Sequence, residues 1–530
     1  MHPLLKNLIQ SLSISILCLL GTCALSVGQD SKSDSPGSEK IYDTEKKTEG
    51  LLSPADSLRS IHFPPGFVKT LFAAEPEIRQ PIAATTDPRG RVWICENYTY
   101  SDRELNFDLS LRDRIVILED TDGDGQMDSR KVFWDQGTRL TSIEIGFGGV
   151  FVLCAPNLLF IPDRNRDDIP DGPPEILLDG WNDNAVRHNI ANGLMWGPDG
   201  WLYGRHGILA TSWVGIPGSS PSQRRSINCG IWRYHPGHQH FEVVAHGTTN
   251  PWGMDYDKNG NLFMINTVIG HLWHVVPGAR FDRMYGSHFN PYTYETIGQT
   301  ADHYHWNKSG GEAWSDTKKI GVTPQTDRFG GGHAHCGLMI YVDQSWPEKY
   351  HNTVFTCNLL GHRINNDRLE KKGNGFTGKH NPDFAKSTDS WFRGIELIRS
   401  HDDGFYILDW QDTGECHEND GVHRNSGRVF KVKFLAEKVS QPAPNLYALS
   451  TDKLFSLITK SRWHFEKAAI VLRERTHASR EEREKVGTLL RAASDRSPAI
   501  RFMKWIFSAD HGADKLFGEN ELPKKLNLLT

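Results

Sequence analysis

Leu194-Met-Trp-Gly-Pro198-Asp199-Gly200-Trp-Leu-Tyr203 places two short apolar stretches on either side of a tight turn. Gly200 suits such a turn because glycine adopts positive φ without strain, and Pro198 and Asp199 are also frequent turn residues. Bulky and aromatic residues before and after the turn are typical of buried strands. The stretch therefore predicts a β-hairpin.

The same pattern occurs five more times along the chain. The other expected hairpins are Ile82–Thr86 with Val92–Cys95, Ile143–Ile145 with Val150–Cys154, Met254–Tyr256 with Leu262–Ile265, Leu338–Tyr341 with Val354–Cys357, and Ile395–Ile398 with Phe405–Leu408. From Gly90 through Gly149, Gly200, Gly260 and Asn352 to Gly404, successive turns are 59, 51, 60, 92 and 52 residues apart. Such a period is typical of propeller blades of about four strands each. We therefore predict a mainly β fold, a six-bladed β-propeller over residues 58–437, closed by pairing of Phe67–Phe72 with Val429–Phe434.

The N-terminal flank predicts export. Lys6 precedes a largely apolar run from Leu8 to Leu25, followed by small residues, so residues 1–28 are predicted to be a signal peptide. We expect a periplasmic or cell-envelope location, with an uncleaved anchor or a lipid on Cys23 as the alternative routes to a membrane. Residues 29–57 are rich in Ser, Asp, Lys and Glu, and are expected to form a disordered linker.

The C-terminal flank changes to a helical pattern. Apolar residues recur at helical spacing among Lys, Arg and Glu in Trp463–Arg475, Glu481–Ala493 and Ala499–Phe507. We expect residues 445–530 to begin a short HEAT-like helical repeat region.

Composition narrows the partners. The formal net charge of −5 over 530 residues argues against nucleic acid, because a phosphate-binding surface needs clustered Lys and Arg. Six cysteines follow the expected signal peptide, which permits either disulfides or buried free thiols. They are Cys95, Cys154, Cys229, Cys336, Cys357 and Cys416.

The hairpin geometry predicts where a site lies. Residues just before the first strand and just after the second strand of each hairpin meet at the end opposite the turns, near the axis, and a concave polar end is the default binding site. The residues entering the blades are Gln80, Thr141, His188, Asn189, Asn192, Thr249, Asn250, His335 and Trp391–Arg393. The residues leaving them are Glu96, Asn97, Asn157, Arg205, His206, Asn266, Asn358 and Asp409.

The longest step between hairpins contains an insertion, Thr267–Gly332. It carries His271, His274, His303, His305, Trp306 and Trp314. We expect it to fold over the axial site as a lid, and an ordinary surface loop is the alternative.

An acidic loop resembles a calcium-binding loop. Asp120, Asp122, Asp124, Gln126 and Asp128 occupy positions one, three, five, seven and nine of an EF-hand pattern, the fourth of them through its carbonyl. Gly125 stands at position six, but Lys131 replaces the glutamate at position twelve. We predict a structural calcium site on a blade hairpin, with a turn that needs no ion as the alternative. A weaker copy spans residues 163–171.

Two motifs carry a family resemblance. His188-Asn-Ile-Ala-Asn192-Gly-Leu-Met-Trp-Gly-Pro-Asp-Gly-Trp-Leu-Tyr203 resembles the blade of soluble quinoprotein glucose dehydrogenases that carries their catalytic histidine. Gly247-Thr-Thr-Asn250-Pro-Trp-Gly253 resembles their motif that contacts pyrroloquinoline quinone.

The run from Phe63-Pro-Pro-Gly-Phe67 to Gly427-Arg-Val-Phe430 is similar to the membrane-bound dehydrogenase family, also called PVC-type haem-binding CxxCH proteins. The resemblance includes Asn358-Leu-Leu-Gly-His362-Arg363-Ile-Asn365 and Leu408-Asp409-Trp410. It implies a propeller joined to a helical-repeat region and a c-type haem module. The sequence departs from these patterns in having Thr249 where the sugar dehydrogenases have arginine, and in lacking any Cys-x-x-Cys-His, so no covalent haem is expected in this chain.

The resemblance implies an oxidoreductase acting on a sugar or alcohol. His188 is the candidate base, because an imidazole titrates near neutral pH. Asp409 is expected to orient this imidazole or to balance its charge. The residues expected to contact a quinone or line its site are Asn250, Arg205, His206, His335, Arg393, Asn266 and Asn358. A c-type cytochrome module or another acceptor would take the electrons. The alternatives are a non-catalytic propeller that binds carbohydrate or protein, and a calcium-dependent hydrolase.

Overall fold

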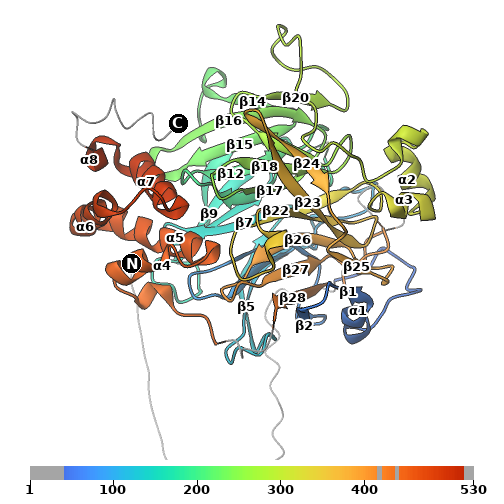
Figure 1. Cartoon of the computed structure of the whole chain (residues 1–530), viewed down its shortest axis with the longest axis horizontal. Coiled ribbons are helices and arrows are strands. Elements are labelled where there is room, and N and C mark those ends of the chain that lie inside the picture. The colour runs from blue at the N-terminus through green and yellow to red at the C-terminus, as the bar shows by residue number, and fades with distance from the viewer. Residues whose placement is uncertain (1–40, 185, 415–420, 436–440, 518–530) are drawn as a thin grey trace, which may run out of the picture. The chain divides into compact units, whose positions relative to one another are not determined.

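The computed structural model describes residues 41–184, 186–414, 421–435 and 441–517. The expected signal peptide, Cys416 and residues 29–40 of the expected linker lie outside these ranges. Six sheets are arranged around a common centre in the described chain (Figure 1), and this confirms the prediction of a six-bladed β-propeller.

The first three blades follow the order of the chain, and their strands run from the innermost outward as follows. The first blade contains β3 (Pro81–Thr86), β4 (Val92–Glu96), β5 (Asp113–Glu119) and β6 (Ser129–Gly137). The second blade contains β7 (Leu140–Gly146), β8 (Gly149–Cys154), β9 (Asn157–Pro162) and β10 (Glu175–Asp179). The third blade contains β11 (Asn192–Trp196), β12 (Leu202–His206), β15 (Gly230–His235), β16 (His240–Thr248) and β20 (Arg280–Arg283). A separate hairpin joins β13 (Ser212–Val214) to β14 (Arg225–Ile227).

The remaining blades take two of their strands from the N-terminus. The fourth blade contains β17 (Pro251–Tyr256), β18 (Leu262–Asn266) and β19 (Leu272–Val275). The fifth blade contains β21 (His335–Tyr341), β22 (Thr353–Asn358), β23 (Arg363–Lys372), β25 (Ala385–Ser387) and β1 (Ile61–His62), with β24 (Gly375–His380) also paired to β23. The sixth blade contains β26 (Gly394–Arg399), β27 (Phe405–Asp409), β28 (Arg428–Phe434) and β2 (Phe67–Ala74). Each of the six predicted hairpins forms the two innermost strands of one blade.

The ring closes as expected from the sequence. Strand β2 runs antiparallel to β28, with Phe67 opposite Phe434 and Leu71 opposite Phe430. The Phe67 ring packs edge-on against Trp346 at 5.0 Å and Phe384 at 4.8 Å, which ties the last blade to its neighbour. Pairing the first strand with the last removes two sheet edges that would otherwise be open.

The segment before the first blade packs on the ring. Thr44 N donates to Val422 O at 3.0 Å, and Trp391 Nε1 donates to Glu49 O at 2.9 Å. Ser53 then caps helix α1 (Pro54–Ser60) by accepting from Asp56 N. Residues 41–57, the second part of the expected linker, are therefore held against the propeller.

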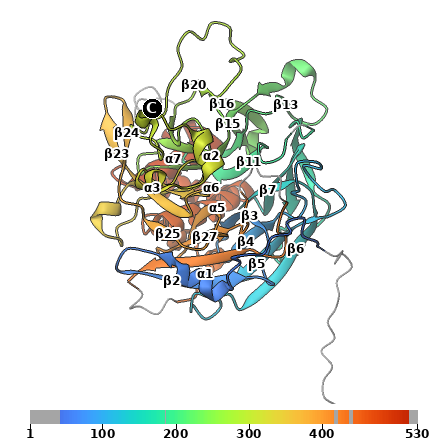
Figure 2. The ribbon, with the colours of Figure 1, turned by 90° about the vertical axis from the view of Figure 1, so that its right-hand side faces the viewer.

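Helices follow the ring, as the apolar spacing predicts. They are α4 (Thr451–Leu457), α5 (Arg462–Ala478), α6 (Arg480–Ala492), α7 (Pro498–His511) and α8 (Asp514–Phe517). Figure 2 shows the blades around their centre with α5, α6 and α7 behind them. The buried Trp463 Nε1 donates to Thr86 Oγ1 at the end of β3, 3.0 Å away, so α5 is anchored to the centre of the ring.

Two further findings concern the cysteines and the helices of the described residues. Cys95, Cys154, Cys229, Cys336 and Cys357 are all buried thiols, the second of the two alternatives. Among the described helices, none combines the length and the apolar character needed to span a bilayer.

Candidate functional site

The innermost strands define two ends of a central shaft. Residues at their starts, such as Thr141, Trp252 and Ile395, line one pocket. Residues near their ends, such as Glu144 and Arg399, line a second cavity that α5 covers. The polar end predicted from the hairpins is therefore the first of these, which we call the axial pocket.

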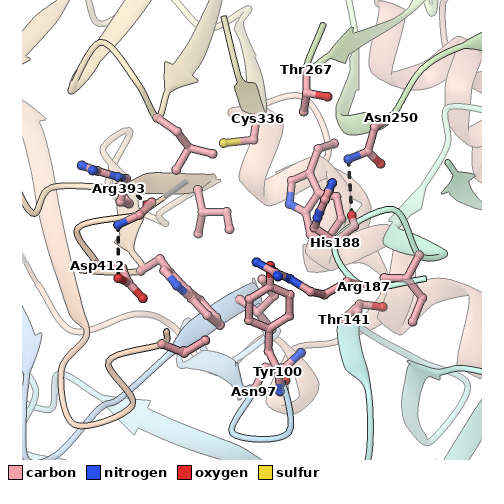
Figure 3. Close-up of a pocket in the computed structure, with 18 of the residues that line it drawn as sticks. Asn97, Tyr100, Thr141, Arg187, His188, Asn250, Thr267, Cys336, Arg393 and Asp412 are labelled. Atoms are coloured by element: carbon pink, nitrogen blue, oxygen red, sulfur yellow. Dashed lines mark hydrogen bonds between the residues drawn. The ribbon is translucent and has the colours of Figure 1, made fainter. Parts of the chain in front are cut away.

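The axial pocket collects residues from every blade (Figure 3). Its lining is Ile82, Asn97, Tyr100, Phe107, Thr141, Arg187, His188, Ile190, Asn250, Trp252, Thr267, Cys336, Leu359, Arg393, Ile395, Trp410, Asp412, Gly414, Gly421 and Val422. Because strand starts and strand ends alternate around it, side chains more than 300 residues apart face the same space.

One wall of the pocket is polar. Asn250 donates from Nδ2 to the carbonyl of His188 at 3.3 Å, which fixes the orientation of its amide. Its Oδ1 atom is buried without a hydrogen-bond partner. Behind it, Asn266 Oδ1 accepts from Asn250 N at 2.7 Å, so Asn266 positions the wall and does not line it. Arg187 adds a guanidinium whose Nε donates to Tyr100 Oη at 2.8 Å.

The other wall is aromatic. The Tyr100 ring packs edge-on against Trp410 at 5.8 Å and Phe107 at 6.1 Å, and Trp252 also lines the pocket. Aromatic faces beside hydrogen-bonding groups are a common arrangement for ligands that have both apolar and polar surface.

Arg393 lines the pocket, but its donors are used by main-chain carbonyls. Nε donates to Gly414 O and Nη1 to Ser390 O, each at 2.9 Å, and Nη2 donates to Thr413 O. Asp412, nearby, accepts from Gly414 N at 3.3 Å, and burial raises the pKa of its carboxyl group. Arg393 therefore fastens a loop of the pocket, and Asp412 adds an acceptor.

Asp409 lies behind the lining. Its Oδ1 accepts from Arg393 N at 2.7 Å and from Gln411 N at 3.0 Å. Complete burial raises the pKa of Asp409 to about 7, although both backbone N–H groups and Arg428 act in the opposite direction. Asp409 thus joins the segment before β26, which carries Arg393, to the loop after β27, which carries Trp410.

Arg205 and His206, which the sequence predicts at the site, do not line the axial pocket. Arg205 lines the second cavity with Glu396. The His206 ring is buried, with Nδ1 2.6 Å from Gly207 O and Nε2 2.7 Å from Ser212 Oγ. Both residues end the same strand, and neither is among the residues that line the axial pocket.

His335 and Asn358 belong to a separate polar network. His335 Nε2 lies 2.5 Å from His305 Nδ1. The Asn358 amide donates to Gly330 O at 3.1 Å and to Gly332 O at 3.2 Å. Of the expected lid, only Thr267 lines the axial pocket in the described chain. His271 immediately precedes β19, the third strand of a blade, and His274 lies within it.

The acidic loop joins β5 to β6. Asp120 accepts from Gly123 N and Gly125 N, and carboxylate oxygens of Asp120, Asp122 and Asp128 lie within 4.8 Å of one another. Asp124 accepts from the backbone N–H of Gln126 at 2.7 Å. The oxygen atoms suit a hard cation such as calcium. In the weaker copy, Asp168 is held by a bidentate contact from Arg91 at 2.7 and 2.8 Å.

Sequence reasoning missed several pocket residues: Tyr100, Phe107, Arg187 and Asp412. Tyr100, Phe107 and Asp412 lie in the loops that follow the second strands of their blades, beyond the strand ends that the hairpins indicate. Arg187 immediately precedes His188, and this position was the one available sign of it.

The fold and the pocket define a six-bladed propeller with a ligand site at one end of its shaft. Residues 53–419 match the family model described as Domain of unknown function (DUF7133), and the chain belongs to this family. A search of the curated proteins finds no match.

Solved structures with a similar chain course are described as sugar dehydrogenases. One is a putative oxidoreductase (glucose dehydrogenase) from Thermus thermophilus, 15% identical, with 69% of this chain and 100% of that chain covered and a TM-score of 0.44. Another is a PQQ-bound aldose sugar dehydrogenase from Streptomyces coelicolor, 14% identical, with 70% and 100% covered and a TM-score of 0.40. A third is the PQQ domain of a pyranose dehydrogenase from Coprinopsis cinerea, 12% identical, with 70% and 97% covered and a TM-score of 0.43.

Proposed function

We propose that the axial pocket binds a sugar or another small polyhydroxylated alcohol, and that the protein is an oxidoreductase acting on it. The observation that carries the proposal is the buried Oδ1 of Asn250, which has no hydrogen-bond partner in the part of the chain that the structure describes, while Nδ2 of the same amide donates to His188 O. A buried acceptor without a donor costs about 1–3 kcal/mol. A ligand hydroxyl would supply that donor.

The aromatic wall favours the same ligand class. Tyr100, Trp252 and Trp410 present apolar surface in the same pocket as Asn250 and Arg187. A sugar ring has apolar C–H faces and a polar rim of hydroxyls, so it matches a pocket with one wall of each kind.

His188 is the proposed base. Oxidation of an alcohol to a carbonyl removes the hydroxyl proton and a hydride from the adjacent carbon. His188 lies in the polar wall beside Asn250, where its imidazole can receive the proton. The hydride passes to a two-electron acceptor.

Pyrroloquinoline quinone matches few of the described lining residues: the arginines among them are Arg187 and Arg393, and Arg187 Nε already donates to Tyr100 Oη. The quinone has three carboxylates, and anions need cationic or N–H donors. Arg393 gives its donors to carbonyls, Arg205 lines the other cavity, and Asp412 adds a carboxylate to the pocket. The quinone is therefore not proposed as the acceptor of the hydride in this pocket.

The same observation favours a second candidate, a propeller that binds carbohydrate without turnover. The pocket offers acceptors and aromatic faces for a sugar, whether or not an electron acceptor joins it. Binding without oxidation would identify this candidate.

The test is a dye-linked oxidation assay over a panel of aldoses and polyols, with and without added quinone. The oxidoreductase proposal expects turnover of at least one substrate, lost in His188→Ala. No turnover with any substrate, or turnover that His188→Ala leaves unchanged, overturns it, and calorimetric binding of the same sugars then distinguishes the second candidate.

Three further proposals come from the sequence. Residues 1–28 direct export to the periplasm or cell envelope, which N-terminal sequencing of the protein from its own host would check. A c-type cytochrome, as a module or a separate protein, reoxidises the two-electron acceptor one electron at a time. Calcium binds at Asp120, Asp122, Asp124 and Asp128, with the Gln126 carbonyl, and stabilises the first blade.

A further inference from the structure

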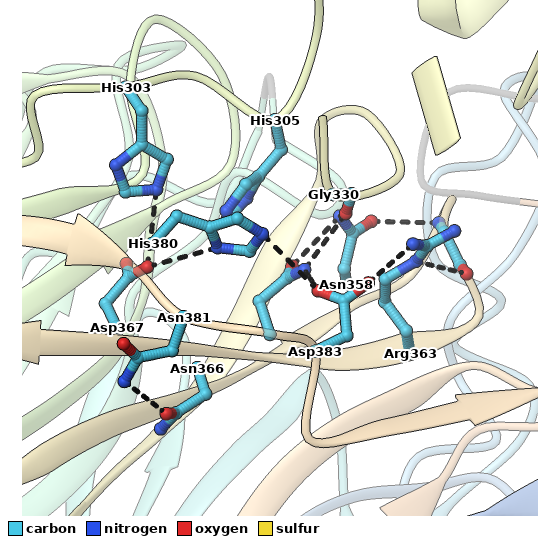
Figure 4. A network of polar contacts seen from close by, with 12 residues as sticks. His303, His305, Gly330, Asn358, Arg363, Asn366, Asp367, His380, Asn381 and Asp383 are labelled. Atoms are coloured by element: carbon cyan, nitrogen blue, oxygen red, sulfur yellow. Dashed lines mark hydrogen bonds and ion pairs between the residues drawn. The ribbon is translucent and has the colours of Figure 1, made fainter. Parts of the chain in front are cut away.

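A compact cluster of histidines joins the insertion to Asp367 of the fifth blade (Figure 4). His271 immediately precedes β19, Asp367 lies in β23, and His303 and His305 lie in the loop that follows β20. One ligand atom from each of these four side chains lies within 4.8 Å of all the others. We call these four residues the histidine site.

The site is buried and its polar atoms are not fully used. His305 is 0% exposed and Asp367 is 2% exposed. Nε2 of His305 has no hydrogen-bond partner among the described residues. Oδ1 of Asp367 makes no hydrogen bond of normal geometry, although Nε2 of His303 lies 3.3 Å from it. Leaving a buried polar atom unsatisfied costs about 1–3 kcal/mol, so these atoms point to a missing partner.

The opposite ring nitrogens are held in place. His305 Nδ1 lies 2.5 Å from His335 Nε2, and His303 Nδ1 lies 3.3 Å from Asp302 Oδ1. This leaves Nε2 of each ring as the nitrogen available to an ion, and Nε2 of His303 lies 3.3 Å from Asp367 Oδ1. Histidines that bind metals are commonly oriented in this way, by a hydrogen bond to the second nitrogen.

A purely structural network explains the arrangement less well. Two imidazoles pack face to face, His271 and His305, with ring centroids 4.3 Å apart. His305 has Nδ1 against His335, and its Nε2 makes no hydrogen bond in the described chain, so hydrogen bonding alone does not account for its place beside Asp367.

Another His/Asp group in the described chain shows the contrast. His477, Asp510 and His511 also lie close together. There Asp510 accepts two bonds from Arg473, at 2.9 and 2.8 Å, so its carboxylate is already paired. Among the described residues, no Arg or Lys forms an ion pair with Asp367, and its carboxylate faces three histidines instead.

We propose that His271, His303, His305 and Asp367 bind one divalent first-row transition-metal ion. Three imidazole nitrogens and one carboxylate suit Zn²⁺, or Fe²⁺ and its neighbours, whereas Ca²⁺ takes about six to eight oxygen ligands. The site differs from the axial pocket and from the acidic loop in its residues, and it does not depend on the proposed oxidation.

An edge of the site reaches the surface. The side chains of His303 and His380 are 18% and 28% exposed, and Nδ1 of His380 lies 3.5 Å from Asp367 Oδ1. An ion can therefore reach the site from solvent without unfolding of the blades, and His380 is placed as a further ligand.

The test is titration of chelator-stripped protein with Zn²⁺ and with Co²⁺, each as the metal alone, followed by calorimetry and by the visible absorption of Co²⁺. We expect one equivalent to bind tightly, a raised melting temperature, and loss of that binding in His305→Ala and Asp367→Asn. Since these variants remove buried groups, His303→Gln, at the partly exposed edge, is the variant to use if they do not fold.

Two variants make the result specific. His335→Gln removes the orienting contact and is expected to weaken binding about 10–100-fold while leaving the stoichiometry at one. His274→Gln is the matched control, because His274 lies on the same strand but packs on Phe263 at 5.1 Å and is expected to bind metal like the wild type. Absence of tight binding by wild-type protein, or equal binding by wild type and His303→Gln, overturns the proposal.

Discussion

The two ends of the shaft are built from the same six strands but use charge in opposite ways. At the end covered by α5, Asp255 contacts both Arg399 and Arg462, and Glu466 accepts from Arg462 at 2.6 Å. At the axial pocket, Asn250 Oδ1 is left without a partner beside a wall of aromatic rings.

The difference separates a structural end from a binding end. Buried charges that neutralise one another, such as Asp255 with Arg399 and Arg462, hold α5 on the ring. Buried polar atoms that the protein itself does not satisfy indicate what a ligand must bring. Variants at each end are therefore expected to change different measurements.

Loss of the base gives the largest expected effect. His188→Ala is expected to lower turnover by about 10²–10⁴-fold, the range for general base catalysis, with little change in melting temperature. Dye-linked rates and thermal unfolding measure the two parts. His240→Ala, at a half-exposed ring outside the pocket, is the control. A rate equal to that of the control variant would remove His188 from the mechanism.

Loss of the anchor at the covered end comes next. Trp463→Ala is expected to lower the free energy of unfolding by about 3–5 kcal/mol, because it removes a ring that is 1% exposed. Urea unfolding measures this, and Trp213→Ala, at a ring that is 56% exposed, is expected to cost much less. Equal costs would show that α5 is not anchored to the shaft through this residue.

Glu396 tests the covered cavity through pH. Burial raises its pKa to about 7, and Arg205 only partly opposes this. The folded protein thus retains a proton that the unfolded chain releases near pH 4.5, so the Glu396 contribution to stability falls as pH rises from about 4.5 to about 7.

Glu396→Gln cannot lose this proton. Beyond any constant offset from the changed pairing with Arg205, its stability relative to wild type is expected to rise by up to about 3 kcal/mol across that pH range. Glu370→Gln, at a half-exposed side chain, is expected to follow the wild-type profile. Parallel profiles for Glu396→Gln and wild type would contradict the assigned pKa.

The acidic loop gives the smallest expected effect. Calcium is expected to raise the melting temperature of wild-type protein by a few degrees, an effect of about 1–2 kcal/mol on a chain of this size, and not that of Asp122→Asn. Scanning calorimetry with calcium and with a chelator measures the shift. Equal shifts in both proteins would place the ion elsewhere.

Local features made the propeller predictable from the sequence. Each hairpin carries its own turn and apolar stretches, so six blades and the pairing of Phe67 with Phe434 follow from residues close to one another or from the need to close the ring. His188 and Asn250 were found for the same reason, since strand starts converge at one end.

The direction of a side chain at a strand end is not local. Arg205 and His206 are adjacent, so the alternation of a strand turns them to different surroundings, and position alone could not distinguish them. The histidine site could not be predicted from the sequence, because it joins His271, His303 and Asp367, which belong to three separate segments.

Calorimetric titration of a panel of aldoses and polyols tests the central claim, that the strand-start end of the shaft is the ligand site. We predict binding at one site per chain, weakened at least about tenfold, or 1.4 kcal/mol, in Asn250→Leu and unchanged in Glu396→Gln at the covered end. Absence of binding by any member of the panel, or equal weakening in both variants, would contradict the account.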